Sequence, residues 1–311
     1  VLIMIGRPVE TILPMISLLA ISSVRFIPAL NTITTSFTSI RLRKYAIDLI
    51  VDLIKEANLL SGKEKSERVY KKDFIKNEIF SNNIKLKNIS FNYGTDKKVA
   101  VNNINIDIAK GKSIGLIGKS GSGKSTLVDI IIGLLEPSTG EIFIDDNNIG
   151  IKKISWQKQL GYVPQEVYLL DDTIRNNIAF GIEKEEIDEK LLSDVIEKSQ
   201  LKNLINSLSN KLDTLIGDRG ARLSGGEKQR IGIARALYNK PKVIVFDEAT
   251  SSLDIYNENK ILKEIYENKK DKTLIIISHR NNTVKYCDLI YVMEDGKIID
   301  NGTFEQIMKK H

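Results

Sequence analysis

Gly118-Lys119-Ser120-Gly121-Ser122-Gly123-Lys124-Ser125 lies between an apolar run at residues 114–117 and a segment with apolar residues at helical spacing that begins at Thr126. Glycines let such a stretch curl, so that successive backbone N–H groups and the start of the following helix point at one anion. The lysine adds positive charge and the last serine a magnesium ligand. The stretch therefore predicts a phosphate-binding loop between a strand and a helix, with a chance Gly/Ser turn as the alternative.

The composition is that of an ordinary globular protein. The 311 residues include 28% charged and 42% hydrophobic residues, enough for one large domain and a smaller part. The net charge of +6 is spread without a dense basic cluster, so it does not predict a nucleic-acid partner. The only cysteine, Cys287, excludes an internal disulfide and fits a reducing compartment. Because the chain starts with Val1, we expect a fragment of a longer protein.

The first 60 residues differ in composition from the rest. Arg25 is the single charge between Thr11 and Ile40. A helix over residues 11–40 is longer than the thickness of the bilayer core, which is about 30 Å. Basic residues at 41–44 follow the apolar run, as expected where a membrane helix enters the cytoplasm. The uncharged piece before Arg25 is short, so hydropathy alone also fits a buried soluble helix. We expect a membrane helix with an amphipathic cytoplasmic extension in residues 1–60.

Residues 61–83 are charged and polar, and we interpret them as a linker. From residue 84 the pattern changes. Two runs that alternate with period two, 84–93 and 99–108, predict antiparallel strands that lead into the phosphate loop. The predicted folded domain therefore covers residues 84–311.

Further elements are expected along this domain. Residues 166–239 carry mostly helical spacing and predict a separate helical lobe. The uninterrupted apolar runs 243–246 and 274–277 are typical of strands buried on both faces of a parallel sheet. Asp295-Gly296 predicts a closing hairpin. The expected fold is α/β.

Two adjacent carboxylates end the apolar run 243–246. Asp247 can hold magnesium, and Glu248 can take a proton from an attacking water. A strand that merely ends in an acidic turn is the alternative. The position of the pair in a parallel sheet that also carries the phosphate loop favours the functional interpretation.

Leu223-Ser224-Gly225-Gly226-Glu227-Lys228-Gln229 precedes another helical segment. Ser224 and Glu227 have the spacing of a capping box, which satisfies the first N–H groups of a helix whatever the function. The same glycine-flanked helix start can offer Ser224 and backbone N–H groups to a phosphate. Both interpretations can hold at once.

Together these segments resemble the ATPase domain of ABC transporters. Residues 118–125 resemble the Walker A loop, residues 223–229 the signature, and Asp247-Glu248 the end of the Walker B strand. Other matches in the family's order are Tyr93, Gln165, the loop 249–254 with Asp254, and His279. Two residues depart from the usual pattern of exporters: Asp218 stands where they carry Glu, and Glu227 where they carry Gln.

The resemblance implies a P-loop NTPase core of RecA type with an antiparallel β subdomain and a helical subdomain. It implies ATP and Mg²⁺ as ligands, with Ser125, Gln165 and Asp247 at the metal. It implies Glu248 as the general base, assisted by His279 and Gln165. The residues implied to bind nucleotide are Tyr93, Gly118, Ser120, Gly121, Ser122, Gly123, Lys124, Ser125, Thr126, Ser224, Gly225, Gly226, Glu227 and Asp254.

In this family two domains pair head to tail, so each ATP lies between the phosphate loop of one and the signature of the other. The expected partners are a second half-transporter, most simply a second copy, and the chain's own upstream transmembrane domain, with five helices before Val1. Residues 12–31 and 168–175 resemble bacterial flippases of lipid-linked oligosaccharides and related polysaccharide exporters. That resemblance implies an ATPase that drives export or flipping of a lipid-linked or amphipathic substrate across the bacterial inner membrane.

Three alternatives remain. One is an exporter of peptides or drugs with the same architecture. Another is a soluble ABC ATPase of DNA repair, but Lys124 and Ser224 lie too close in the sequence for the long coiled coil of that class. The third is a translation factor with two tandem ATPase domains, whereas this chain has one. We also hypothesise that Arg25 faces the transport path and meets an anionic headgroup, because an intramembrane charge is costly unless paired or hydrated.

Overall fold

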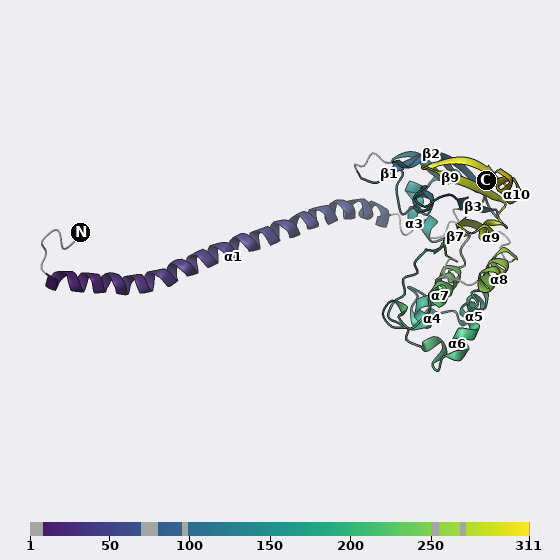
Figure 1. Cartoon of the computed structure of the whole chain (residues 1–311). Helices are drawn as coiled ribbons and strands as arrows, with labels where there is room; N and C mark the ends of the chain where they lie inside the picture. The colour runs from purple at the N-terminus through teal and green to yellow at the C-terminus, as the bar shows by residue number, and fades with distance from the viewer. Residues whose placement is uncertain (1–8, 70–79, 95–98, 250–254, 268–271, 311) are drawn as a thin grey trace. The chain divides into compact units, whose positions relative to one another are not determined.

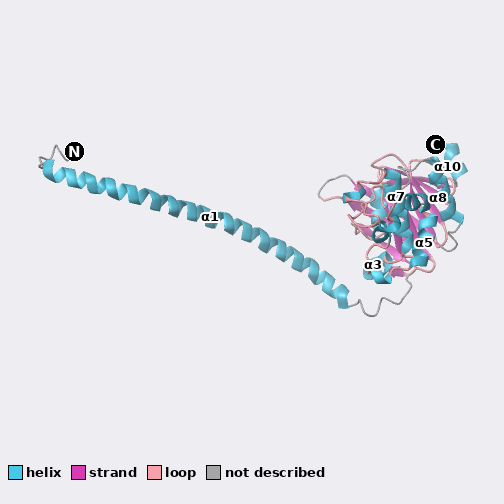
Figure 2. Ribbon diagram, turned by 90° about the horizontal axis from the view of Figure 1, so that it is seen from below, coloured by secondary structure: helices cyan, strands magenta, loops and turns pink. Residues whose placement is uncertain are grey.

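The computed structural model describes residues 9–69, 80–94, 99–249, 255–267 and 272–310. Two compact units, Val1–Ile75 and Lys76–His311, make up the chain. Among the described residues, the first unit is a single helix, and the second contains all of the strands (Figures 1 and 2).

Helix α1 (Val9–Val69) contains 61 residues and includes Pro14 and Pro28. Its segment Pro14–Lys55 is long and apolar enough to cross a membrane, and all its side chains are exposed in this chain. The expected linker begins as helix instead, because α1 continues to Val69. Glu, Lys and Arg have good helix propensity, and residues 61–69 are rich in them.

Hydroxyl groups within α1 are satisfied by the helix itself. Ser22 Oγ donates to the carbonyl of Leu18 at 2.7 Å, and Thr32 Oγ1 donates to the carbonyl of Pro28 at 2.9 Å. Such bonds to the preceding turn let serine and threonine lie in an apolar medium without an unpaired donor. The hydroxyl-rich sequence of α1 is therefore compatible with lipid or with a helix bundle.

The second unit is built on two sheets. A four-stranded antiparallel sheet has the order β2-β1-β4-β5, and a six-stranded sheet has the order β10-β9-β3-β8-β7-β6. The strands are β1 (Asn83–Asn92), β2 (Val99–Ala109), β3 (Ser113–Ile117), β4 (Thr139–Ile144), β5 (Asn147–Asn148), β6 (Leu160–Val163), β7 (Val243–Asp247), β8 (Thr273–Ile277), β9 (Leu289–Glu294) and β10 (Lys297–Gly302). The predicted antiparallel pair, buried strands and closing hairpin are confirmed.

The six-stranded sheet is covered on both faces. On β7, Ile244 and Phe246 join one apolar cluster, whereas Val243 and Val245 join another that also includes the antiparallel sheet. Side chains alternate across a strand, so an uninterrupted apolar run fills two cores. This burial fixes the carboxyl end of β7, where Asp247 and Glu248 lie.

Helices surround the sheets. They are α2 (Lys124–Ile131), α3 (Ile149–Gln157), α4 (Ile174–Ile178), α5 (Glu189–Lys198), α6 (Lys202–Ser207), α7 (Gly225–Tyr238), α8 (Ile255–Glu267), α9 (Asn281–Val284) and α10 (Phe304–Lys310), with short 3-10 turns at Lys184–Glu186, Lys211–Asp213 and Asp218–Gly220. In Figure 1, α4, α5, α6 and α7 gather on the side away from β1 and β2.

The helical lobe packs against the six-stranded sheet. Leu192 and Val195 of α5 belong to the same apolar cluster as Ile244 and Phe246 of the six-stranded sheet. The lobe is too small to enclose a core alone and shares the core of the sheet. The folded unit also begins before residue 84, because Phe80 is fully buried and its ring lies edge-on to Trp156 at 5.8 Å.

Candidate nucleotide-binding site

The phosphate loop joins β3 to α2 and requires its glycines. Gly118 has φ of +149° and Gly123 has φ of +98°, a region that side chains disfavour. A Cβ on Gly118 would lie 2.1 Å from the carbonyl oxygen of Met293, and one on Gly123 would lie 2.3 Å from that of Ala100. The loop is therefore wedged between β2 and the end of β9, which fixes its curvature.

Lys124 lies inside this loop. Its Nζ donates to the carbonyl oxygens of Gly118 at 2.8 Å and Lys119 at 2.9 Å, and the residue is 5% exposed. Burial lowers the pKa of the Lys124 ammonium, while Glu248 and Asp247 act in the opposite direction. The ammonium is thus a buried positive charge at the centre of a curled loop, where a phosphate would gain most from it.

A hydroxyl and a carboxylate converge beside the loop. Ser125 Oγ donates to Asp247 Oδ1 at 3.3 Å, and the hydroxyl of Tyr162 lies 3.5 Å from Asp247 Oδ2. Burial raises the pKa of the Asp247 carboxyl, and the residue is buried. No group of three or more His, Cys, Asp or Glu side chains forms a metal cage within the described parts of the chain. Mg²⁺ fits this pair nevertheless, because it commonly takes one or two protein oxygens, phosphate oxygens and water.

Glu248 brings three of the predicted residues together. Its Oε1 lies 2.6 Å from His279 Nε2, and its Oε2 accepts a hydrogen bond from Gln165 Nε2 at 3.3 Å. Its backbone is left-handed, with φ of +49°, and its N–H donates to the carbonyl of Ile277 at 3.0 Å. This costly conformation turns the carboxylate out of β7 toward the loop.

These groups line one pocket of about 670 Å³. Tyr93 stands at its mouth, 53% exposed, with its hydroxyl 3.1 Å from Thr126 Oγ1. The lining residues that the sequence indicated are Tyr93, Ser120, Gly121, Gly123, Lys124, Ser125, Thr126, Gln165, Glu248 and His279. Val99, Ala100, Asp295 and Gly296 also line it. None of these four residues was predicted to line the pocket. The turn signal at Asp295-Gly296 was the one sequence feature that could have drawn attention to this part of the wall.

Comparison with known proteins agrees with this geometry. Residues 101–251 match the model of the family described as "ABC transporter". This match covers the phosphate loop, the signature and the end of β7. The chain carries an ABC transporter ATPase domain.

Relatives of this ABC domain are exporters. The chain is 35% identical over 291 residues to an "ATP-dependent lipid A-core flippase" of Vibrio parahaemolyticus, which covers 92% of this chain and 47% of the flippase. It is 40% identical over 228 residues to "Alpha-hemolysin translocation ATP-binding protein HlyB" of Escherichia coli O157:H7, covering 73% of this chain and 32% of that protein.

A solved structure of "a bacterial Atm1-family ABC exporter with ATP bound" superimposes with a TM-score of 0.71 at 32% identity, covering 74% of this chain and 41% of that one. The predicted fold class, a P-loop core with an antiparallel β subdomain and a helical subdomain, is confirmed. The chain spans less than half the length of these relatives.

The ABC signature lies outside the pocket. Ser224 caps α7: Glu227 N donates to Ser224 Oγ at 3.3 Å, and Ser224 N donates to Glu227 Oε2 at 2.7 Å. The predicted capping box is confirmed. Ser224, Gly225, Gly226 and Glu227 line none of the nucleotide pocket. Gly118, Ser122 and Asp247 support it without lining it, and Asp254 lies outside the described residues.

Proposed function

We propose that the chain binds ATP with Mg²⁺ and hydrolyses it to drive export or flipping of a lipid-linked or amphipathic substrate across the bacterial inner membrane. The observation that carries the proposal is the position of Glu248. Its carboxylate is held between His279 and Gln165 at the wall of the pocket that also contains the curled phosphate loop.

The loop binds the phosphates in this proposal. Backbone N–H groups of residues 118–125 and the start of α2 face the anion, and Lys124 adds a charge-assisted hydrogen bond. Tyr93 offers an exposed ring on which an adenine can stack. Ser125 and Asp247, whose oxygens lie 3.3 Å apart, hold Mg²⁺ together with Gln165. The ion supplies neutralisation of phosphate charge.

Glu248 acts as the general base. Its carboxylate accepts the proton of the attacking water, while the amide of Gln165 and the imidazole of His279 fix its orientation. His279 also reaches the pocket and can contact the terminal phosphate. Proton transfer and electrostatic positioning are therefore assigned to separate groups, as phosphoryl transfer requires.

A second half-transporter completes each site. Ser224, Gly225, Gly226 and Glu227 form the capped start of α7 and do not reach the pocket of their own chain. A helix start with an exposed Gly225 and a partly exposed Gly226 suits an anion. We propose that this surface contacts the ATP that the partner's phosphate loop holds. The working unit is then a dimer, most simply of two identical chains. Asp254 acts across the interface of this dimer.

Helix α1 supports a membrane location and a lipid-linked substrate. The match to the lipid A-core flippase covers 92% of the chain, whereas Lys76–His311 alone is about three quarters of it, so that match includes residues of α1. The match to the hemolysin translocation protein covers 73%. This difference favours a lipid-linked substrate, with peptide export as the second candidate. A soluble ABC ATPase does not need the 42-residue apolar segment Pro14–Lys55.

Glu248→Gln tests the assignment. The amide keeps the shape of the carboxylate but cannot take a proton, so the variant should bind ATP and fail to hydrolyse it. Hydrolysis by the variant at the rate of the unaltered chain would refute Glu248 as the base. Stimulation of hydrolysis by lipid-linked oligosaccharide, but not by peptide, in the complete transporter tests the substrate class.

A further inference from the structure

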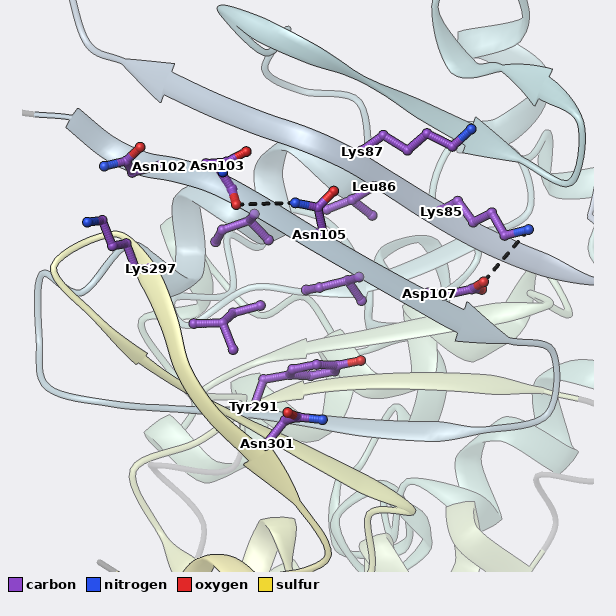
Figure 3. Close-up of a pocket in the computed structure, with 13 residues that line it drawn as sticks. Lys85, Leu86, Lys87, Asn102, Asn103, Asn105, Asp107, Tyr291, Lys297 and Asn301 are labelled. Carbon is purple, nitrogen blue, oxygen red and sulfur yellow. Dashed lines mark hydrogen bonds and ion pairs between the residues drawn. The ribbon is translucent and has the colours of Figure 1, made fainter.

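A second and larger hollow lies away from the nucleotide pocket. It measures about 880 Å³, and strands β1, β2, β9 and β10 supply its lining (Figure 3). We call it the β2–β10 groove. Its lining residues are Lys85, Leu86, Lys87, Asn102, Asn103, Ile104, Asn105, Ile106, Asp107, Tyr291, Lys297, Ile298 and Asn301. None of the residues assigned to ATP lines it.

Two edge strands form the walls of the groove. β2 ends the antiparallel sheet and β10 ends the six-stranded sheet. At one end of the groove the two strands meet, where Asn102 N donates to the carbonyl of Gly296 at 2.8 Å. Edge strands present unpaired backbone N–H and C=O groups that can receive an added strand. An extended chain therefore suits the groove better than a compact molecule does.

Tyr291 provides a hydroxyl that can donate a hydrogen bond to a ligand in the groove. The residue is 7% exposed, and its hydroxyl is directed into the groove in Figure 3. The hydroxyl oxygen is not among the buried atoms without a partner in the described part of the chain, so it is open to the groove. Burial, and to a smaller extent Asp107, raises the pKa of the phenol, so the hydroxyl stays protonated and can donate. The hydroxyl is therefore available as a hydrogen-bond donor to a ligand that enters the groove.

The charge of the lining favours an acidic partner. Three lysines face one aspartate, Asp107, whose Oδ2 lies 3.7 Å from Lys85 Nζ. The ammonium of Lys87 lies 4.7 Å from the centre of the Phe143 ring. Lys297 makes neither an ion pair nor a cation–π contact within the described part of the chain, and it lines the groove. Lysines alone could serve to protect a sheet edge from pairing. The Tyr291 hydroxyl adds a donor inside the groove, which such protection does not need.

We propose that the β2–β10 groove binds an extended acidic segment of a partner protein, which adds as a strand to an open edge while Tyr291 and Lys297 contact its carboxylates. The groove adjoins the nucleotide pocket through the β9–β10 turn: Gly296 lines the pocket, and Lys297 lines the groove. Occupation of either one is therefore expected to change affinity at the other.

Fluorescence anisotropy with the full chain in detergent tests the proposal. The probe is a short fluorescein-labelled peptide of alternating Glu and Val, compared with one of alternating Lys and Val. We expect saturable binding of the acidic peptide only. Tyr291→Phe, which removes a single hydroxyl, should raise Kd roughly ten- to hundredfold, as expected for one hydrogen bond to a charged group. Tyr286→Phe, a change at an exposed tyrosine outside the groove, should leave Kd unchanged.

The outcomes separate this proposal from the one for ATP. Equal binding of both peptides, absence of saturable binding, or an unchanged Kd in Tyr291→Phe would overturn it. Displacement of the peptide by pyrophosphate would overturn it as well and assign the groove to a compact phosphate ligand. Lys124→Ala should abolish ATP binding and leave peptide binding intact, because Lys124 does not line the groove.

Discussion

His279 Nε2 lies 2.6 Å from Glu248 Oε1, so two residues on different loops form one hydrogen-bonded unit at the nucleotide pocket. Glu248 follows β7 and His279 follows β8, and these strands are parallel neighbours. Carboxyl ends of parallel strands meet at one edge of a sheet, which explains how residues far apart in the sequence come into contact.

His279→Ala should slow hydrolysis strongly without abolishing ATP binding. It removes the imidazole that lies 2.6 Å from Glu248 and the contact to the terminal phosphate that we propose for it. We expect kcat to fall about 10²-fold, the size typical of losing one component of general-base catalysis. Steady-state phosphate release measures kcat, and equilibrium binding measures ATP affinity. His311→Ala, at the other histidine of the sequence, is the control. Equal kcat in both variants would remove His279 from the mechanism.

Gly123→Ala should distort the phosphate loop. The added Cβ would meet the Ala100 carbonyl oxygen at 2.3 Å, and the residue would also hold φ of +98°. Gly181 has φ of +77° and open space around its Cβ position, so Gly181→Ala carries only the backbone strain of about 1–2 kcal/mol. Gly123→Ala should therefore lower Tm further and weaken ATP binding at least tenfold. Matching Tm and ATP affinity in the two variants would contradict the wedged loop.

Arg280 and Glu258 form an ion pair in which one partner is buried and the other is partly exposed. Arg280 Nη1 lies 2.8 Å from Glu258 Oε2, and Thr283 Oγ1 donates to Glu258 Oε1 at 2.7 Å. The Glu258 side chain is 3% exposed and that of Arg280 is 43% exposed. Arg280→Ala removes the cation that lies 2.8 Å from the buried Glu258 carboxylate and should cost about 3 kcal/mol of unfolding free energy.

Glu258→Gln should cost less, because the partly exposed Arg280 can be hydrated and Gln can still accept hydrogen bonds. Urea unfolding monitored by circular dichroism gives both free energies. A larger loss in Glu258→Gln than in Arg280→Ala would reverse the expected order and refute the role of burial.

Asp247→Asn should stabilise the chain in the absence of Mg²⁺. Burial raises the folded-state pKa of Asp247 above its unfolded-state pKa. Between these two pKa values the folded state binds more protons than the unfolded state, so the free energy of unfolding falls as pH rises through them. The neutral amide removes this loss, and we expect a gain in unfolding free energy at pH 7 that disappears once both states are protonated at acidic pH.

Thermal melts in EDTA across this pH range measure the effect. Asp146→Asn, at an exposed aspartate, should show no such pH-dependent gain. A lower Tm of Asp247→Asn at pH 7 would mean that the buried carboxylate stabilises the fold.

The sequence predicted the site better than its surroundings. The loop 118–125, Glu248 and His279 follow apolar runs whose spacing identifies buried strands, and burial leaves those strands little freedom. Val99 and Ala100 were missed, because they reach the pocket only through tertiary packing of β2 on the loop. Gly296 N donates to the Ser122 carbonyl at 3.1 Å, a contact that no local pattern encodes.

The helical lobe and the short elements were harder to predict. Spacing in α5 identified its apolar face but not the surface that the face covers, so the shared core with β7 was not foreseen. Strand β6 has only 4 residues, too few for a pattern of its own, and is fixed by its parallel pairing with β7. The β2–β10 groove arises between edges of two different sheets, and strand patterns do not specify how two sheets meet.

Phosphate release by the full chain and its Glu248→Gln variant, measured with ATP and Mg²⁺ alongside equilibrium ATP binding, tests the central claim most directly. We predict ATP hydrolysis by the unaltered chain, and in the variant an unchanged ATP affinity with hydrolysis reduced at least 10²-fold. Hydrolysis by Glu248→Gln at the unaltered rate, or failure of both proteins to bind ATP, would contradict the account.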